Sequence, residues 1–238
     1  LFTDASIEFR LNGSYLSRVA FPNGKLTGSF PSIKFMPGDT VSVDAYLGDD
    51  KLTGATTVVP TVVPIEKVDT VRVLRKQTDG RYLFVMKTTV RFTDMPNKAD
   101  FYQLQLFHHT TSQSGASVTD TIDYLKEDRV FYDPEVGVSS FESIDFQGLF
   151  PDEVINGTSY GLVIYLPVAY FQKNDANVQN RLVYRLYHVD ELYYGFLRAR
   201  IIALSNQDLP VFNDVKMPSN VLNGYGVVTS LSPHDYEI

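Results

Sequence analysis

The stretch TGATTVVPTVVPIEKVDTVRV, residues 53–73, decides how the chain divides. It contains two Val-Val-Pro steps four residues apart and no charged side chain before Glu66. A proline offers no N–H to a sheet and holds the preceding residue extended, so two prolines this close do not fit a central strand. We interpret Pro60 and Pro64 as part of a stiff connector between two domains. The alternative is an edge strand of one continuous sandwich.

On both sides of the connector, apolar and polar residues alternate with the period of two that is typical of half-buried antiparallel strands. Residues 6–11 place their apolar side chains on one face, and residues 40–47 repeat the pattern after a Pro-Gly turn. Further along, residues 82–92 form a long alternating segment that is followed by a partner segment at 102–107. Residues 160–166 are apolar on both faces, which is typical of a central strand. These patterns predict a mainly β fold.

A single segment changes to the period of an α-helix. Asp190 can cap its N-terminus, and apolar residues recur at intervals of three and four over residues 191–204. Several strand segments and one late helix predict two antiparallel β-sandwich domains of the immunoglobulin-like kind. We place these domains at residues 1–64 and 65–238.

The negative charge is concentrated in one segment. The chain has 28 acidic and 21 basic side chains, and residues 120–153 hold ten of the acidic and two of the basic ones. A chain that is acidic and has no basic patch is a poor candidate for binding nucleic acid. We expect residues 110–120, which are rich in Ser and Thr, to form a loop, and the acidic segment to pass over the surface.

The residue types exclude several kinds of chemistry. The chain has no Cys, so it has no disulfides, thiolate metal ligands or Cys nucleophiles. It has no apolar run of about 18 residues, so we predict no membrane-spanning helix, and we expect any signal peptide or lipid-bearing Cys to lie upstream of Leu1. The nucleophile elbow, zinc-protease helix, phosphate loop and dinucleotide fingerprint are all missing from the sequence.

The histidines do not suggest a metal site. His108 and His109 are neighbours, and on a strand they point to opposite faces, where they cannot share an ion. His188 and His234 have no partner at a recognised ligand spacing. We therefore predict no catalytic residues, no metal ligands and no cofactor.

Two further possibilities stay open in the acidic segment. Calcium binds six to eight oxygen atoms. Carboxylate and amide oxygens are available at Glu127, Asp128, Asp133, Glu135 and Asn156. Paired carboxylates can also serve a glycoside hydrolase, but only when they lie a few ångströms apart in a cleft. A solvated acidic loop is the simplest interpretation.

Near the C-terminus, three segments follow one another in an order that is specific in combination. They are YYGFL at 193–197, MPSNV at 217–221 and NGYGVV at 223–228. In this order they resemble the end of an uncharacterised Bacteroidota family, domain of unknown function 4249. Its members show a Tyr-rich helix, a Pro-x-Asn-Ile element and Asn-Gly-x-Gly-x-Phe-Gly before a last strand. Here Val-Val stands in place of the usual Phe-Gly.

Upstream segments resemble the same family. They are VPIEKV at 63–68, FTDMP at 92–96 followed by FYQL at 101–104, and FPDEVING at 150–157. The resemblance therefore runs from about residue 55 to the end. The family's opening strand is missing, so we interpret residues 1–60 as an immunoglobulin-like domain that has lost its first strand.

The resemblance implies a location and a kind of role. Such proteins resemble outer-membrane lipoproteins that are often encoded beside TonB-dependent receptors, and no activity is established for them. We therefore expect a non-enzymatic binding or accessory protein that is lipid-anchored at the outer membrane, with a TonB-dependent receptor or a surface ligand as its partner. The alternatives are a structural or adhesive surface protein and a glycan hydrolase.

The resemblance also implies bacteria that attach O-glycans to Asp-Thr before an apolar residue. Asp39-Thr40, Asp69-Thr70 and Asp120-Thr121 fit that pattern. The first two begin predicted strands. The third falls in the predicted polar loop and is the best candidate.

Overall fold

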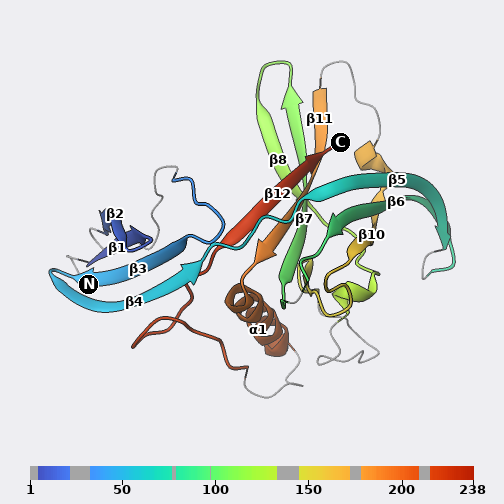
Figure 1. Cartoon of the computed structure of the whole chain (residues 1–238). Coiled ribbons are helices and arrows are strands. Elements are labelled where there is room, and N and C mark those ends of the chain that lie inside the picture. The colour runs from blue at the N-terminus through green and yellow to red at the C-terminus, as the bar shows by residue number, and fades with distance from the viewer. Residues whose placement is uncertain are drawn as a thin grey trace. The chain divides into compact units, whose positions relative to one another are not determined.

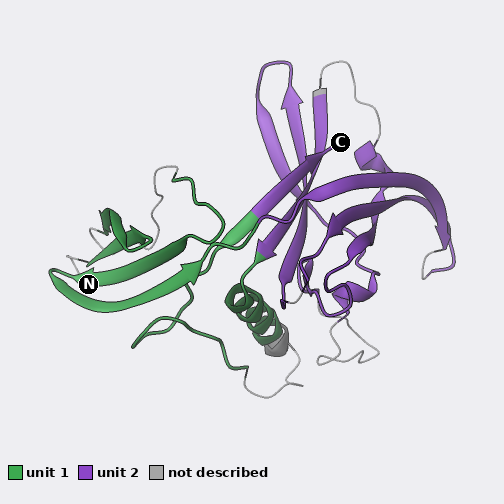
Figure 2. Cartoon of the chain, in the orientation of Figure 1, with its two compact units in different colours: residues 1–61, 189–232 green, residues 62–188, 233–238 purple. Residues whose placement is uncertain are grey.

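The computed structural model describes residues 5–21, 33–76, 79–96, 98–132, 145–171, 178–208 and 215–238. The chain forms two compact units (Figure 2). Unit 1 comprises residues 1–61 and 189–232, and unit 2 comprises residues 62–188 and 233–238. The prediction of a mainly β fold with antiparallel sheets and one α-helix is confirmed.

Unit 1 contains a four-stranded antiparallel sheet in the order β2-β1-β3-β4 (Figure 1). Its strands are β1 (Ala5–Leu11), β2 (Ser14–Ala20), β3 (Thr40–Leu47) and β4 (Asp50–Val58). Asn12 and Gly13 turn β1 into β2 with φ of 50° and 80°, a left-handed conformation that Asn and Gly tolerate. The hairpin that the Asn-Gly pair predicts is therefore present.

One face of this sheet buries charge. Glu8 and Asp44 lie directly opposite each other on β1 and β3, and both are buried. Lys51 binds Asp44 at 2.7 Å and Arg10 binds Glu8 at 2.6 Å, so the long basic side chains cover the carboxylates. On the opposite, apolar face Val41 and Ala55 are buried, whereas Ile7 is only half-buried.

The connector forms no strand. β4 ends at Val58 and β5 begins at Ile65, as the two prolines predict. The N–H of Val59 donates to the Asp39 carbonyl in unit 1, and Val63 belongs to the core of unit 2. The division into domains 1–64 and 65–238 stays a prediction. The compact units change at residue 61, but they also place residues 189–232 in unit 1.

The helix α1 (Glu191–Asp208) begins where the sequence predicts. Asp190 Oδ1 accepts the N–H of Tyr193 at 2.6 Å, which satisfies an N-terminal donor of the helix. Its Oδ2 accepts the hydroxyl of Thr57 at 2.8 Å and the N–H of Ser230 at 3.3 Å. Asp190 therefore joins the later part of unit 1 to β4, and these contacts explain why residues after 189 belong to this unit.

Unit 2 contains two sheets (Figure 1). The first has the order β10-β6-β5, with β5 (Ile65–Lys76), β6 (Tyr82–Thr93) and β10 (Ser159–Pro167). The second has the order β12-β11-β7-β8, and β9 pairs with β7. Its strands are β7 (Phe101–Ser112), β8 (Ser117–Ile122), β9 (Leu149–Pro151), β11 (Val178–Val189) and β12 (Leu231–Glu237). Two short 3-10 helices, η2 (Arg129–Phe131) and η3 (Val168–Phe171), complete the unit.

The core of unit 2 draws its side chains from both sheets. At its centre lie three aromatic rings from β6, β7 and β9. The ring centroids of Phe92 and Tyr102 are 5.5 Å apart, and so are those of Tyr102 and Phe150. All three residues have no exposed surface. This packing agrees with a sandwich, and the immunoglobulin-like arrangement stays a prediction.

Two expectations for the middle of the chain are wrong. Residues 117–122 form β8 and not a loop, so Asp120-Thr121 lies in a strand, opposite His108 and Phe107. Thr favours strands, and hydroxyl and imidazole pairs such as His109–Thr119 at 2.7 Å connect β7 to β8.

The described parts of the acidic segment are also more than a surface excursion. Tyr124, Val130, Phe146 and Phe150 are buried, and the Tyr124 hydroxyl donates to the Leu104 carbonyl at 2.7 Å. These buried residues are spaced irregularly among the acidic residues, so the sequence shows no periodic pattern that would predict their burial.

Phe92 and Phe84 allow a matched test of this core. Both lie on the same face of β6, but Phe92 is fully buried and Phe84 is 53% exposed. We expect Phe92→Ala to lower the free energy of unfolding by about 3–5 kcal/mol, since it removes a core ring and leaves a cavity. Phe84→Ala is expected to change it by less than about 1 kcal/mol. Chemical denaturation measures both values, and equal losses would contradict the location of the core.

Candidate functional site

Three buried aspartates converge in unit 2. Asp94 follows β6, Asp100 precedes β7, and Asp152 follows β9. Less than 4% of each residue is exposed, and each offers a carboxylate oxygen within 4.8 Å of those of the other two. We call Asp94, Asp100 and Asp152 the carboxylate cluster.

Asp94 is held by two hydrogen bonds. Its Oδ1 accepts the hydroxyl of Tyr102, and its Oδ2 accepts the N–H of Gly157 at 2.7 Å. Burial, together with the hydrogen bond to Asp94, raises the pKa of Tyr102, so its hydroxyl stays protonated and continues to donate. Both oxygens of Asp94 are therefore fixed by the core.

Gly157 is required at its position for two reasons. Its φ is +69°, a conformation that L side chains rarely adopt. A Cβ there would also lie 3.0 Å from Cβ of Pro96 in the turn after β6. The close approach of these two turns brings the Gly157 N–H to Asp94.

In the described structure, two nitrogen-bearing side chains lie close to the carboxylate cluster, and both contact Asp100. His188 Nε2 lies 3.0 Å from Oδ1, and Lys98 Nζ lies 3.3 Å from the same oxygen. His188 is almost fully buried, whereas 64% of the Lys98 side chain is exposed. Asp100 Oδ2 is buried and has no hydrogen-bond partner.

Asp152 is tied in through its backbone. Its N–H donates to the Asp100 carbonyl at 3.0 Å, and its own carbonyl accepts from the N–H of Ile155 at 2.7 Å. Asp152 Oδ2 is buried and unpartnered, like Asp100 Oδ2. Burial raises the pKa of Asp152, and the charges of Asp94 and Asp100 add to the rise. In total, the cluster contains two buried carboxylate oxygens that accept no hydrogen bond, Oδ2 of Asp100 and Oδ2 of Asp152.

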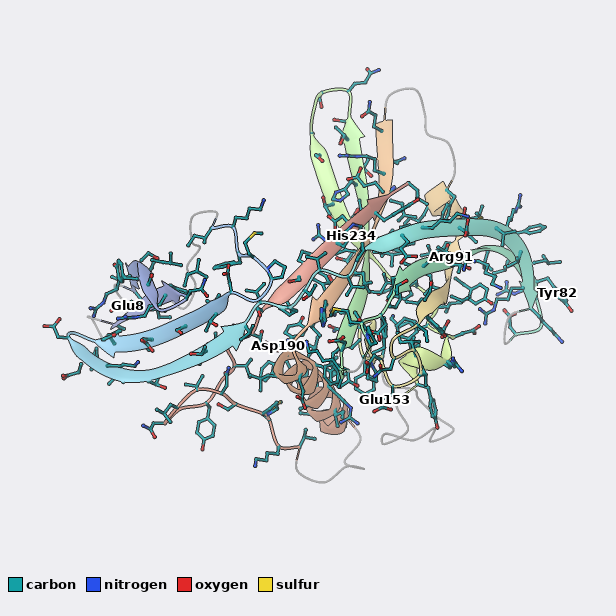
Figure 3. The ribbon with its side chains drawn as sticks, in the orientation of Figure 1. Glu8, Tyr82, Arg91, Glu153, Asp190 and His234 are labelled. Atoms are coloured by element: carbon teal, nitrogen blue, oxygen red, sulfur yellow. The ribbon has the colours of Figure 1, made fainter. Side chains whose placement is uncertain are left out.

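A second feature of unit 2 is an apolar surface at the far end of β5 and β6. We call residues 71–76 and 82–85 the hairpin end. Tyr82, labelled in Figure 3, lies at this end of the hairpin and is 60% exposed. Leu74 and Phe84 face each other across the two strands and are more than half exposed.

A hollow lies beside the hairpin end. Its volume is about 430 Å³, and its lining comes from residues 83–85 of β6, residues 165–168 and residues 123–125. Most of these side chains are apolar. The Arg75 guanidinium lies 4.7 Å from the Tyr165 ring centroid, and the Arg72 guanidinium lies 4.0 Å from that of Phe84. Such cation–π contacts hold long basic side chains against an apolar surface.

The residues that the sequence singled out lie mostly elsewhere. His108 packs edge-on against Tyr170, His109 contacts Thr119, and His234 Nδ1 accepts the N–H of Ile65 at 3.0 Å. The one candidate that reaches the cluster is His188.

Among the residues considered for calcium, Glu127, Asp128 and Asn156 each contact different partners in the described structure. Asp128 caps η2 and accepts the Tyr160 hydroxyl at 2.5 Å, and Glu127 pairs with Arg75. Asn156 donates to the Lys98 carbonyl at 3.3 Å, and Asp133 and Glu135 fall outside the described residues.

Sequence reasoning missed Asp94 and Asp100 because each is one ordinary Asp in a turn. The signal available was the position of each aspartate relative to the segments that carry the resemblance. Asp94 lies within 92–96, Asp100 directly precedes 101–104, and Asp152 lies within 150–157. The structure shows that these segments meet around one cluster.

Fold and site together define a mainly β protein whose larger unit encloses a cluster of carboxylates. A family model described as a domain of unknown function (DUF4249) matches residues 2–237, and the chain belongs to this family. A comparison with curated proteins finds no match. Among the described helices, none combines the length and hydropathy that crossing a membrane requires.

Tyr102 and Tyr184 test how strongly the core depends on the bond to Asp94. Neither residue has exposed surface. We expect Tyr102→Phe to lower the free energy of unfolding by about 1–3 kcal/mol, because it leaves Asp94 Oδ1 buried without its donor. Tyr184→Phe is expected to cost less, since no carboxylate is found against its hydroxyl in the described residues. Denaturant titration at one pH compares them, and a Tyr102→Phe variant as stable as the wild type would contradict this role.

Proposed function

We propose that the protein is a non-enzymatic binding or accessory protein of the cell envelope, held at the outer membrane and associated with a TonB-dependent uptake system. The hairpin end carries this proposal. It presents apolar side chains on both faces of a two-stranded ribbon: Leu74 and Phe84 on one face, Val71 and Leu83 on the other. Large exposed apolar patches are typical of interaction sites.

The form of this surface favours a polypeptide partner over a small ligand. A small-molecule pocket encloses most of its ligand. Here the lining of the hollow beside β6 includes the exposed side chains of Leu83 and Phe84, which are more than half accessible to solvent. In addition, β5 is the edge strand of its sheet in the described structure, and an edge strand can pair with a strand of a partner. We therefore propose that the receptor itself occupies the hairpin end.

The carboxylate cluster supports a non-enzymatic role as well. Catalytic carboxylates must reach a substrate in a cleft. Asp94, Asp100 and Asp152 are almost fully buried, and they line neither the hollow beside β6 nor the cavity of about 310 Å³ next to Phe131.

Co-purification with the neighbouring receptor tests the proposal. The chain is produced in its native cells, and its complexes with TonB-dependent receptors of the outer membrane are captured in detergent. We expect the wild type to retain the receptor and the double variant Leu83→Ser/Phe84→Ser to lose it by at least about tenfold, because about two hot-spot side chains are removed. Leu52→Ser, which changes an equally exposed leucine of β4, is the matched control and is expected to bind like the wild type.

Two outcomes would overturn the proposal. The first is a receptor that does not bind, or that binds the double variant and the wild type alike. The second is turnover of a glycan by the purified wild type that is lost in the Asp152→Asn variant, which would show an enzyme. Separation of inner and outer membranes from the native cells tests the location, and we expect the protein in the outer-membrane fraction.

A further inference from the structure

We propose that Asp94, Asp100 and Asp152 bind one calcium ion inside unit 2. This inference does not depend on partner binding at the hairpin end. The three carboxylates come from separate turns, at residues 94, 100 and 152, and the fold brings them together.

The spacing of the carboxylates fits one calcium ion. Their ligand oxygens all lie within 4.8 Å of one another. Calcium binds oxygen at about 2.3–2.6 Å, so two ligands on opposite sides of the same ion are at most about 5 Å apart. The three residues can therefore contact a single ion without moving their backbones apart.

The unpartnered oxygens are the second and independent observation. Asp100 Oδ2 and Asp152 Oδ2 are buried and accept no hydrogen bond, although their residues are 1% and 3% exposed. A buried carboxylate oxygen without a partner is costly, because it has lost its water and gained nothing in return. A cation between these oxygens removes that cost. Three of the other oxygens are already held, two of Asp94 by Tyr102 and Gly157 and one of Asp100 by His188, so they are oriented in advance.

The balance of charge at the cluster also favours a bound cation. Three buried carboxylates face one nearby ammonium group, that of Lys98, which is mostly exposed and lies 3.3 Å from Asp100. A divalent ion neutralises the excess that remains. The excess negative charge can also be neutralised by a proton that is shared between carboxyl groups, and the effect of calcium on the protein distinguishes a bound ion from a shared proton.

The donor set selects calcium among the common ions. Zinc prefers nitrogen and sulfur ligands. The chain has no Cys, and the only imidazole that the described structure places at the cluster, His188, directs Nε2 to Asp100. Magnesium usually keeps several waters, and a cluster so closed leaves little room for them. Calcium accepts an irregular set of carboxylate and carbonyl oxygens.

The test uses the whole purified chain and calcium itself. Metal content is measured first, and we expect about one calcium per chain that EDTA removes. Thermal unfolding is then followed in EDTA and in excess CaCl2. At a free calcium concentration a hundred times the dissociation constant, we expect the midpoint to rise by about 5–10 °C, and MgCl2 to have a smaller effect.

Asp152→Asn and Glu153→Gln form a matched pair for this test. They are neighbours, and Glu153 is exposed (labelled in Figure 3) whereas Asp152 belongs to the cluster. We expect Glu153→Gln to respond like the wild type and Asp152→Asn to bind calcium at least about tenfold more weakly. In EDTA, Asp152→Asn should unfold at or above the wild-type midpoint, since it removes a buried like charge, so a lost response does not mean a misfolded variant.

Terbium provides a readout that does not depend on stability. Terbium takes calcium sites, and a nearby tyrosine sensitises its emission. The chain has 15 Tyr and no Trp, and Tyr102 contacts Asp94 directly. We expect saturable emission that calcium displaces, that Tyr102→Phe weakens and that Asp152→Asn abolishes. Absence of calcium from the wild type together with a midpoint unchanged by CaCl2 would overturn the site, as would a calcium response that Asp152→Asn retains. The first result would favour the shared proton, and the second would place the calcium ion elsewhere in the protein.

Discussion

The constraint on which unit 2 depends is the burial of three carboxyl groups beside its aromatic core. Taking a carboxylate out of water costs several kcal/mol unless hydrogen bonds or a counter-charge compensate. Tyr102 connects the two features, since its ring packs between Phe92 and Phe150 while its hydroxyl donates to Asp94. The same side chain therefore contributes to the core packing and to the compensation of the buried carboxylate.

The cluster also explains how separate turns of unit 2 are held in register. The turn after β6 meets the turn before β10 through Asp94 and Gly157, and the turn before β7 meets the end of β9 through Asp100 and Asp152. The first contact joins a backbone N–H to a carboxylate and the second joins two backbone groups, and both hydrogen bonds are directional, unlike apolar packing. Each of these contacts lies within one sheet, and the three-stranded and the larger sheet are connected by the Tyr102 hydroxyl on Asp94 and by the apolar core.

The sequence predicts what depends on neighbours along the chain. The proline connector, the alternation in β6 and β7 and the cap at Asp190 are local patterns, and all three are present. The contact of Asp100 with His188 joins residues 88 positions apart, and no local pattern encodes it. The interpretation of the acidic segment was wrong for a related reason. Its many charged residues indicate an exposed segment, and the few residues that are buried in the core, such as Tyr124, form no local pattern.

The strand β6 relates the two functional regions, and its length separates them. It begins at Tyr82 in the hairpin end and stops one residue before Asp94. Twelve residues of strand extend over about 40 Å along the chain. Because the Coulomb energy falls with distance, charge at the cluster acts only weakly on a partner at the hairpin end. Coupling between the two regions passes mainly through the packing of β6, whose half next to the cluster is fixed by buried side chains such as Val90. A cation that stabilises the base of this strand would keep the hairpin end in place, and it would leave the chemistry of that surface unchanged.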